Sequence, residues 1–176
     1  MAFWREAGEV RWFAKDTAFD AAVRERFEPL HWQASRGELA FWERDAPGAL
    51  ALLLLTDQFP RNLYRGSAHA FASDAMALAI AERALMHGFD RITEPVLRPF
   101  FYLPFEHHEN AASQARAVIL LEQHARETGD AKSLDYARLH ASLIARFGRF
   151  PHRNPVLGRE STQEETAYIE QGGFAG

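Results

Sequence analysis

One segment in the first third of the chain is apolar on every side of the helix that it predicts. Residues 48–58 read Gly-Ala-Leu-Ala-Leu-Leu-Leu-Leu-Thr-Asp-Gln. A helix without a polar face is a buried helix, because no side of it can face water at low cost. The sequence therefore predicts that this segment is a buried helix.

The remainder of the chain repeats its apolar residues with the helical period of 3.6, and no stretch alternates as a strand would. Further helices are expected at residues 17–35, 38–44, 67–87, 109–128, 132–147 and 162–169, with only short helical pieces among the prolines of 94–105. At 176 residues the chain is long enough for one compact domain with its own core. The sequence therefore predicts an all-α protein of a single domain, residues 1–176, whose tail at 171–176 is flexible.

Composition argues against several classes of function. The net charge of −4 disfavours nucleic acid as the main partner, because phosphate binding needs a basic excess. Cysteine is absent, so disulfides, thiolate zinc sites and cysteine nucleophiles are excluded. The longest apolar run, residues 49–55, is too short for a membrane span, and the first residues lack the pattern of a signal peptide. We therefore expect a cytoplasmic protein without a membrane partner. No cofactor is expected, because the sequence has no phosphate-binding glycine loop or dinucleotide fingerprint.

A short phrase occurs twice in the chain. Phe59-Pro60-Arg61-Asn62 is followed by Gly66, and Phe150-Pro151-His152-Arg153-Asn154 is followed by Gly158. Proline pushes the residue before it out of helical geometry, so each copy is expected to lie just past the end of a helix. Turn formation explains the prolines and much of the asparagines, but it leaves the arginines unexplained. Two matching basic corners predict one shared polar site.

The charges around these corners favour an anion-binding site. Asp57 lies near the end of the apolar helix, where the helix dipole and a dry environment both oppose a negative charge, so it needs a cation such as Arg61 or Arg65. Arginine binds carboxylates and phosphates through two parallel hydrogen bonds. The expected partner is an anionic small molecule or a peptide carboxylate. The candidate ligand-binding residues are Gln58, Arg61, Asn62, Arg65, Arg146, Arg149, His152, Arg153 and Asn154.

The segment at residues 105–109 contains the best candidates for acid–base catalysis. Histidine titrates near neutral pH, and a neighbouring carboxylate can tune it. If the protein is an enzyme, we expect its catalytic groups to be Glu106, His107 and Asp57. A metal site is not expected, because adjacent residues on a helix point about 100° apart and neither HExxH nor a paired Glu-x-x-His set occurs.

Several motifs together resemble those of a known family, the bacterial DUF924 proteins. The motifs that carry the resemblance include Trp12-Phe13-Ala14-Lys15-Asp16, Asp57-Gln58-Phe59-Pro60-Arg61-Asn62, Tyr64-Arg65-Gly66, Pro104-Phe105-Glu106-His107 and the segment from Arg146 to Asn154. The resemblance covers essentially the whole chain and implies an all-helical fold similar to tetratricopeptide repeats, with antiparallel helix pairs in a right-handed stack. The family's function is unassigned, so the resemblance implies a fold and motif positions but no activity.

Three functions are compatible with these features. The first is a module that binds an anionic small molecule or peptide carboxylate through the arginine-rich corners. The second is a hydrolase or lyase that anchors an anionic substrate on the arginines and uses Glu106 or His107 as acid or base. The third is a protein-interaction domain, in which the motifs are internal clasps that hold the helices together.

Overall fold

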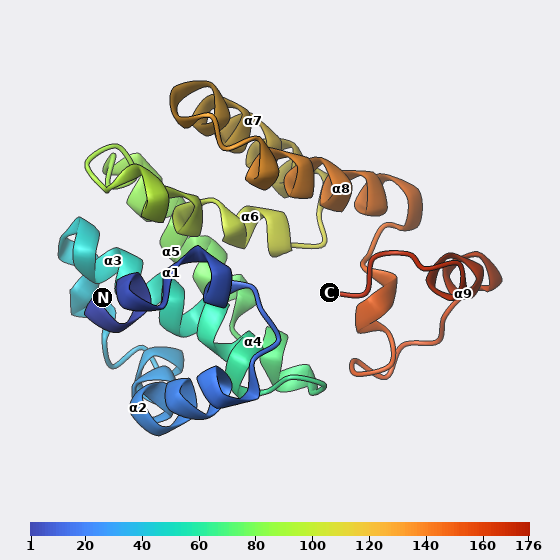
Figure 1. Ribbon diagram of the computed structural model, residues 1–176, viewed down its shortest axis with the longest axis horizontal. Coiled ribbons are helices and arrows are strands. Elements are labelled where there is room, and N and C mark those ends of the chain that lie inside the picture. The colour runs from blue at the N-terminus through green and yellow to red at the C-terminus, as the bar shows by residue number, and fades with distance from the viewer.

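The computed structural model describes residues 1–176, and its regular structure is helical throughout, which confirms the all-α, single-domain prediction (Figure 1). The α-helices are α1 (Ala2–Trp12), α2 (Thr17–Ser35), α3 (Ala46–Leu53), α4 (Phe59–Leu63), α5 (Asp74–Met86), α6 (Leu103–His107), α7 (Ala111–Thr128), α8 (Ala131–Phe147) and α9 (Gln163–Glu170). Short 3-10 helices cover Ala40–Arg44, Ala68–Phe71, Pro95–Phe101 and Pro151–Arg153, and a π-helical turn covers Leu54–Gln58.

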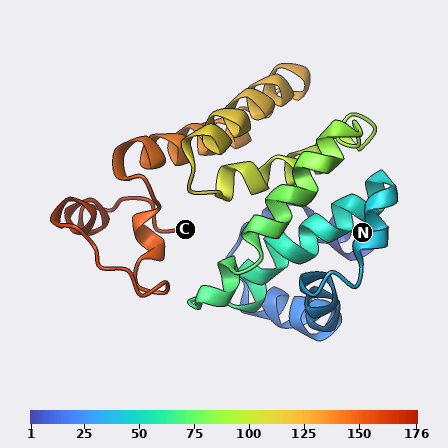
Figure 2. The same cartoon turned by 180° about the vertical axis from the view of Figure 1, so that it is seen from behind.

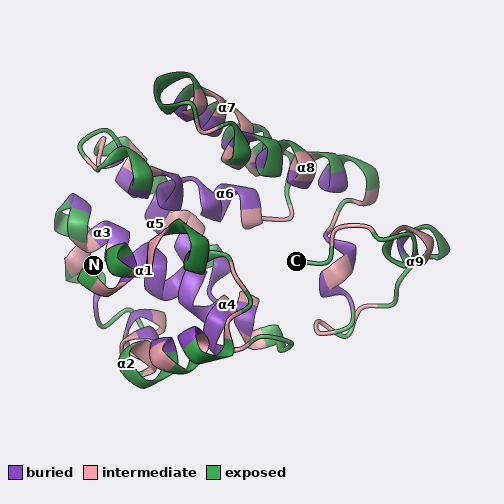
Figure 3. Ribbon diagram, viewed as in Figure 1, coloured by how far each residue is buried: buried purple, intermediate pink, exposed green.

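The apolar segment forms the centre of the main core. The leucines of α3 and the π turn are at most 3% exposed (Figure 3). Helices α2 and α5 and the 3-10 helices Ala40–Arg44 and Pro95–Phe101 pack against this segment. Figure 2 shows α5 running beside α3 from behind, and the two helices are in contact. The prediction of a buried helix at this place is confirmed.

The last two long helices form a pair that leads into a separate lobe. Gly129 and Asp130 join α7 to α8, and the two helices lie side by side (Figure 1). After α8 the chain forms the turn at Pro151–Arg153 and then α9, and the tail returns between this lobe and the helical body (Figure 1). The lobe has a small core of its own around Phe150. The tetratricopeptide-like, right-handed stacking stays a prediction.

The structure adds one helix that the sequence pattern did not indicate. Helix α1 is interrupted at Gly8, whose φ of 71° and ψ of 168° lie outside the helical region. This break divides the helical period into pieces too short to recognise. Trp4 and Trp12 lie buried on either side of the break, and their rings stack with centres 5.7 Å apart.

The predicted helix at 67–87 is divided in two. Residues Ala68–Phe71 form a 3-10 turn, and α5 begins only at Asp74. Ser67 accepts a hydrogen bond from the backbone of His69 and thereby caps the short turn. The end of the helix agrees with the prediction, because Gly88 has a φ of 69° in the left-handed region that favours glycine.

The first Phe-Pro-Arg-Asn phrase does not end its helix, which contradicts the prediction. Phe59 has helical dihedrals (φ −62°, ψ −37°), and the chain continues through Pro60 to Leu63 by way of the π turn. The second copy behaves as predicted, because Phe150 is extended (φ −90°, ψ 109°). A proline within a helical run is tolerated when other donors replace its missing N–H.

Side chains supply the donors that the π turn lacks. His31 Nδ1 lies 2.8 Å from the carbonyl oxygen of Leu55, Ser73 Oγ donates to that of Thr56 at 2.6 Å, and an Arg61 terminal nitrogen donates to that of Asp57 at 2.5 Å. Three consecutive carbonyl groups are thus satisfied from three different elements. π turns inside helices occur frequently at functional sites, and this one carries Asp57.

Replacing Ser73 with alanine is expected to lower the free energy of unfolding by about 1–3 kcal/mol, because the buried carbonyl of Thr56 would lose its side-chain donor. Urea unfolding measures this change. Ser142→Ala is the matched control, since that exposed hydroxyl bonds only to the carbonyl of Leu139 in its own helix. A Ser73→Ala variant as stable as the control would contradict this role of Ser73.

Candidate functional site

The arginines of the two repeated phrases converge on one carboxylate. Arg61 in α4 binds Asp74 through two hydrogen bonds of 3.1 Å each. Arg153, from the turn at Pro151–Arg153, reaches the same carboxylate at 3.4 Å. Asp74 is the first residue of α5 and is only 8% exposed. The predicted meeting of the two basic corners is therefore seen at Asp74, a residue that the sequence analysis did not select.

Asp57 is the second buried carboxylate of this site. Its Oδ1 lies 2.7 Å from His107 Nδ1 and 3.4 Å from an Arg61 terminal nitrogen, while Gln58 donates to its Oδ2. Burial opposes the charge of Asp57, but His107 and Arg61 outweigh it and hold the pKa of Asp57 below its usual range. The structure thus brings Asp57, Gln58, Arg61 and His107 together, and the cation that Asp57 needs is Arg61.

His107 and Asp57 form an oriented dyad. Asp57 is ionised and can only accept, so Nδ1 of His107 carries the proton and Nε2 presents its lone pair. No protein group bonds to Nε2, and the side chain is 14% exposed. Burial, followed by the positive charge of Arg61, lowers the pKa of His107 in spite of Asp57. A neutral imidazole with a held tautomer and a free lone pair has the form of a general base.

Glu106 has an unsatisfied oxygen beside this dyad. Its Oε1 lies 3.0 Å from His140 Nδ1, and its Oε2 is buried without a partner. His140 Nδ1 also lies 2.8 Å from the carbonyl of Tyr136, so this nitrogen carries the proton. The rings of His107 and His140 are 6.4 Å apart. Glu106 is therefore a third buried acid of the site, held on one side only.

Arg153 has a single polar side-chain partner, although its charge is buried. Its guanidinium lies 4.4 Å from the ring centre of Phe71 and 4.6 Å from that of Phe150. Apart from the 3.4 Å contact to Asp74 it makes no hydrogen bond, and its Nε is buried and unpartnered. Burial and then the charge of Arg61 lower the pKa of Arg153 to about 10. Aromatic faces stabilise the cation, but they leave one edge of it unused.

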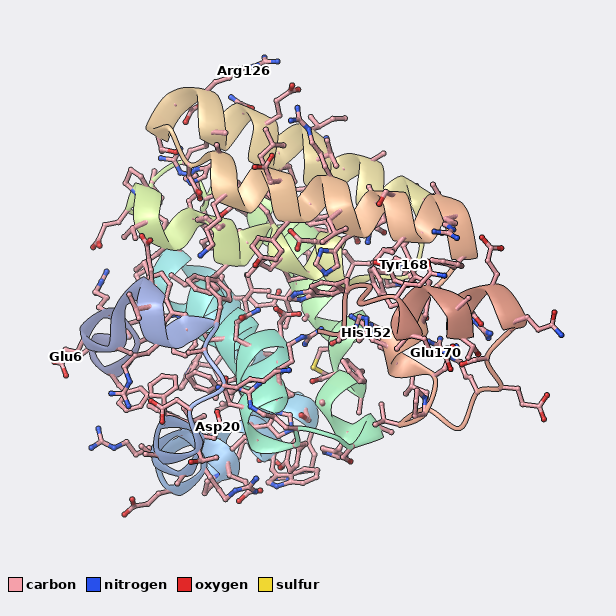
Figure 4. All side chains as sticks on the ribbon, turned by 45° about the vertical axis from the view of Figure 1, so that its right-hand side comes forward. Glu6, Asp20, Arg126, His152, Tyr168 and Glu170 are labelled. Carbon is pink, nitrogen blue, oxygen red and sulfur yellow. The ribbon has the colours of Figure 1, made fainter.

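His152 and the tail lie at the outer side of the cluster that Asp57, Arg61, Asp74, Glu106, His107 and Arg153 form. Burial and the charge of Arg153 lower the pKa of His152 to about 3, and its Nδ1 is buried without a partner. Phe174 packs its ring 4.8 Å from His140 and 5.2 Å from His152, and its backbone N–H donates to the hydroxyl of Tyr168 at 2.9 Å. Figure 4 shows His152 and Tyr168 together on this side of the molecule. The tail prediction of flexibility stays untested, but Phe174 has defined neighbours.

The asparagine of the first phrase lies outside this cluster. Asn62 donates to Asp20 of α2 at 2.7 Å, and Arg65 binds the same carboxylate through bonds of 2.6 and 3.1 Å. Figure 4 shows Asp20 well away from His152. Asn62 and Arg65 therefore hold α2 against the end of α4, as the clasp interpretation expects.

The second phrase repeats this arrangement in the C-terminal lobe. Arg149 binds Glu165 through bonds of 2.6 and 2.7 Å, and Asn154 donates to the same carboxylate at 3.3 Å. Thr162 and Glu165 form a capping box at the start of α9. Arg146 pairs with exposed Glu164 at 2.8 Å, beside a shallow hollow of about 350 Å³ between α8 and α9. In each copy of the phrase the arginine (Arg61 or Arg153) belongs to the buried cluster, whereas the asparagine (Asn62 or Asn154) bonds to an acid outside it.

The Glu165 clasp predicts a dependence of stability on acid. The bonds from Arg149 lower the pKa of Glu165 from 4.5 to about 2. This carboxylate therefore stabilises the fold above the unfolded pKa, and the contribution is lost as the pH falls from about 4.5 to about 2. Glu165→Gln should destabilise the protein at pH 7, and its difference from the parent should shrink toward pH 2 in urea unfolding. The exposed control, Glu164→Gln, should differ little at either pH, and a constant Glu165→Gln difference would contradict the clasp.

Comparison with known proteins places the chain in a family. The profile of a family described as a bacterial protein of unknown function, DUF924, matches residues 1–173. A solved structure, titled as a protein of unknown function from Agrobacterium tumefaciens, is 46% identical and has a TM-score of 0.91, with 97% of this chain and 94% of that chain covered. This chain belongs to the DUF924 family. None of the curated proteins matches it.

No group of three or more histidine, cysteine or acidic residues is arranged to hold a metal ion. No helix is both long enough and apolar enough to span a bilayer.

Three residues of the DUF924 site escaped the sequence analysis. Asp74 looks like an ordinary acid in the first turn of a helix. His140 falls in the packing stripe of α8, and Phe71 lies in a predicted helix as one apolar residue among many. The sequence held one signal for Asp74. Two repeated arginines that meet need an acid that both can bind, so one of the acids between them in the sequence could have been expected to be buried.

Proposed function

We propose that this DUF924 protein binds a small organic carboxylate in the buried site formed by Asp57, Arg61, Asp74, Glu106, His107 and Arg153. The observation that carries the proposal is the unused edge of Arg153. Its Nη1 faces Asp74, whereas Nε and Nη2, which form the other edge of the guanidinium, have no protein partner. Two parallel N–H groups on one edge match the two oxygens of a carboxylate.

The contrast with Arg61 supports this assignment. Both terminal nitrogens of Arg61 are engaged, by two carboxylates and a carbonyl group. An arginine that is only 6% exposed loses hydration that its single long contact to Asp74 does not replace. A bound anion would replace the lost hydration of Arg153. The net charge of −4 disfavours nucleic acid as the source of that anion.

Glu106 narrows the class of ligand. Its buried Oε2 needs a hydrogen-bond donor. A carboxylate that also carries a hydroxyl or amino group would bind Arg153 at one end and Glu106 at the other. We therefore infer that hydroxy or amino acids, or the end of a peptide, fit better than a plain carboxylate.

Ligand-dependent thermal stability tests the proposal. Lactate and propionate, which differ in the hydroxyl group, are added to the parent protein, with phosphate as a third anion. A ligand at a hundred times its Kd stabilises the native state by about 2.7 kcal/mol, and lactate is expected to raise Tm more than propionate. Arg153→Met should abolish this increase, and Arg146→Met should retain it. Equal increases in both variants would mean that the ions act on the surface, and the proposal would fail.

The Asp57–His107 dyad favours a second candidate, a hydrolase or lyase acting on the bound carboxylate. With its tautomer fixed by Asp57, His107 can take a proton at Nε2 from water or from a carbon of the substrate. Glu106 would accept a hydrogen bond from the substrate and hold it, and the protonated His107 would return the proton from Nε2. Arg61 and Arg153 would hold the charge in place during the reaction.

The protonation state of His107 tests this candidate before any substrate is known. Nitrogen NMR should show His107 neutral at pH 7, with the proton on Nδ1 and a pKa below 6.5. A His107 that is protonated at pH 7 cannot accept a proton and would exclude the base role. Once turnover is found, Asp57→Asn should reduce it by roughly 10²–10⁴-fold, because asparagine stabilises the wrong tautomer.

A further inference from the structure

A second hollow lies on the other side of the π turn. It has a volume of about 110 Å³ and is enclosed by the C-terminal half of α2, the 3-10 turn Ala68–Phe71 and the start of α5. The carbonyls of Leu55 and Thr56 face this side, where His31 and Ser73 bond to them. None of the residues proposed to bind the carboxylate lines this hollow.

His31 lines the hollow and has an unused hydrogen-bond acceptor. Its Nδ1 lies 2.8 Å from the Leu55 carbonyl, and a carbonyl oxygen can only accept, so Nδ1 carries the proton. Nε2 is then a lone pair, and it is buried without a partner in a residue that is 1% exposed. Burial lowers the pKa of His31, which keeps the ring neutral at physiological pH.

Ser35 adds a hydroxyl group one helical turn later. Residues four apart on a helix lie on the same face, and both His31 and Ser35 line the hollow. Ser35 Oγ is also buried without a partner. A hydroxyl group of a ligand fits this pair, because it can donate to His31 Nε2 and accept from Ser35 Oγ at the same time.

Aromatic rings form much of the wall of the hollow, and no carboxylate, lysine or arginine lines it. The rings of Trp32 and His69 are 4.8 Å apart, and Tyr64 packs against His69 at 4.4 Å. Ala72, Ser73 and Met76 complete the lining. Aromatic walls and a thioether favour a flat apolar body. A charged ligand would lose its hydration without gaining a counter-charge.

We propose that this hollow binds a small uncharged molecule in which a hydroxyl group is attached to a flat apolar body, such as a phenol. The hydroxyl donates to His31 Nε2 and accepts from Ser35, and the ring lies against Trp32 and Met76. The site differs from the proposed carboxylate site in its residues and in the charge of its ligand. This proposal can therefore be tested independently of the function proposed above.

Phenol and toluene form a matched pair of probes, because they have nearly the same shape and differ in the hydroxyl group. Titration of the nitrogen-labelled protein should move the His31 Nε2 resonance saturably with phenol. Toluene should bind at least about tenfold more weakly, since it leaves the histidine acceptor unpaired. Equal shifts from the two probes, or no shift from phenol at millimolar concentration, would overturn the proposal.

Ser35→Ala is the variant of choice, because its hydroxyl has no partner and its removal should not unfold the protein. Phenol should bind this variant roughly fivefold more weakly than the parent. Ser142→Ala, the same change on the exposed face of α8, should bind phenol as the parent does. Unchanged phenol affinity in Ser35→Ala would exclude the hydroxyl from the site and refute the assignment.

Discussion

Arg61→Met is expected to lower the free energy of unfolding by about 3–5 kcal/mol, because it leaves the buried carboxylates of Asp57 and Asp74 facing each other without their shared cation. Asp57 is 1% exposed and Asp74 is 8% exposed, so water cannot replace the guanidinium. Denaturant unfolding measures the change.

Two matched arginine-to-methionine variants serve as controls for Arg61→Met. Arg146→Met breaks an exposed pair with Glu164 and should cost less than about 1 kcal/mol. Arg153→Met keeps an apolar stem between Phe71 and Phe150 and removes a buried charge that has a single long hydrogen bond. It should also cost less than about 1 kcal/mol. If Arg153→Met were as damaging as Arg61→Met, both arginines would be structural and the clasp interpretation would extend to the whole cluster.

Asp74→Asn is expected to cost about 3 kcal/mol, since the two guanidinium groups of Arg61 and Arg153 would lose the one carboxylate that they share. Thermal unfolding of the variant with and without lactate measures both this loss and its consequence. A bound carboxylate should restore part of the missing negative charge, so lactate should raise Tm more in Asp74→Asn than in the parent.

Asp135→Asn is the control for this change, because Asp135 is exposed on α8. It should leave Tm and its response to lactate unchanged. An Asp74→Asn variant that is as stable as the control would mean that Asp74 does not hold the two corners together.

The helices with regular amphipathic periods could be predicted from the sequence, and the places where the structure differs have physical reasons. Gly8 breaks the first helix into short pieces, so α1 was not recognised. Pro60 is tolerated inside a helix because His31 and Ser73, which are distant in the sequence, and the neighbouring Arg61 supply donors to the carbonyl groups of the π turn. No local rule predicts the two distant donors.

The sequence predicts which charged residues gather at the site, but it does not predict which acid each of them binds. The repeated phrase correctly indicates that Arg61 and Arg153 meet, because turn formation leaves both arginines unexplained. The same phrase suggests equal roles for the asparagines, yet Asn62 and Asn154 point to other acids. Which acid each group selects depends on how the lobe after α8 packs, and that packing is set by long-range contacts. The roles of these residues in binding stay predictions.

The arginine side-chain resonances provide the most direct test of the central claim, that Arg153 is held with an edge free for a carboxylate. The N–H signals at Nε are followed by NMR while lactate is added to the parent protein. The account predicts that the Arg153 signal shifts saturably, whereas the signal of Arg65, which is occupied by Asp20, stays in place. An Arg153 signal that does not move, or that moves only together with exposed arginines such as Arg146, would contradict it.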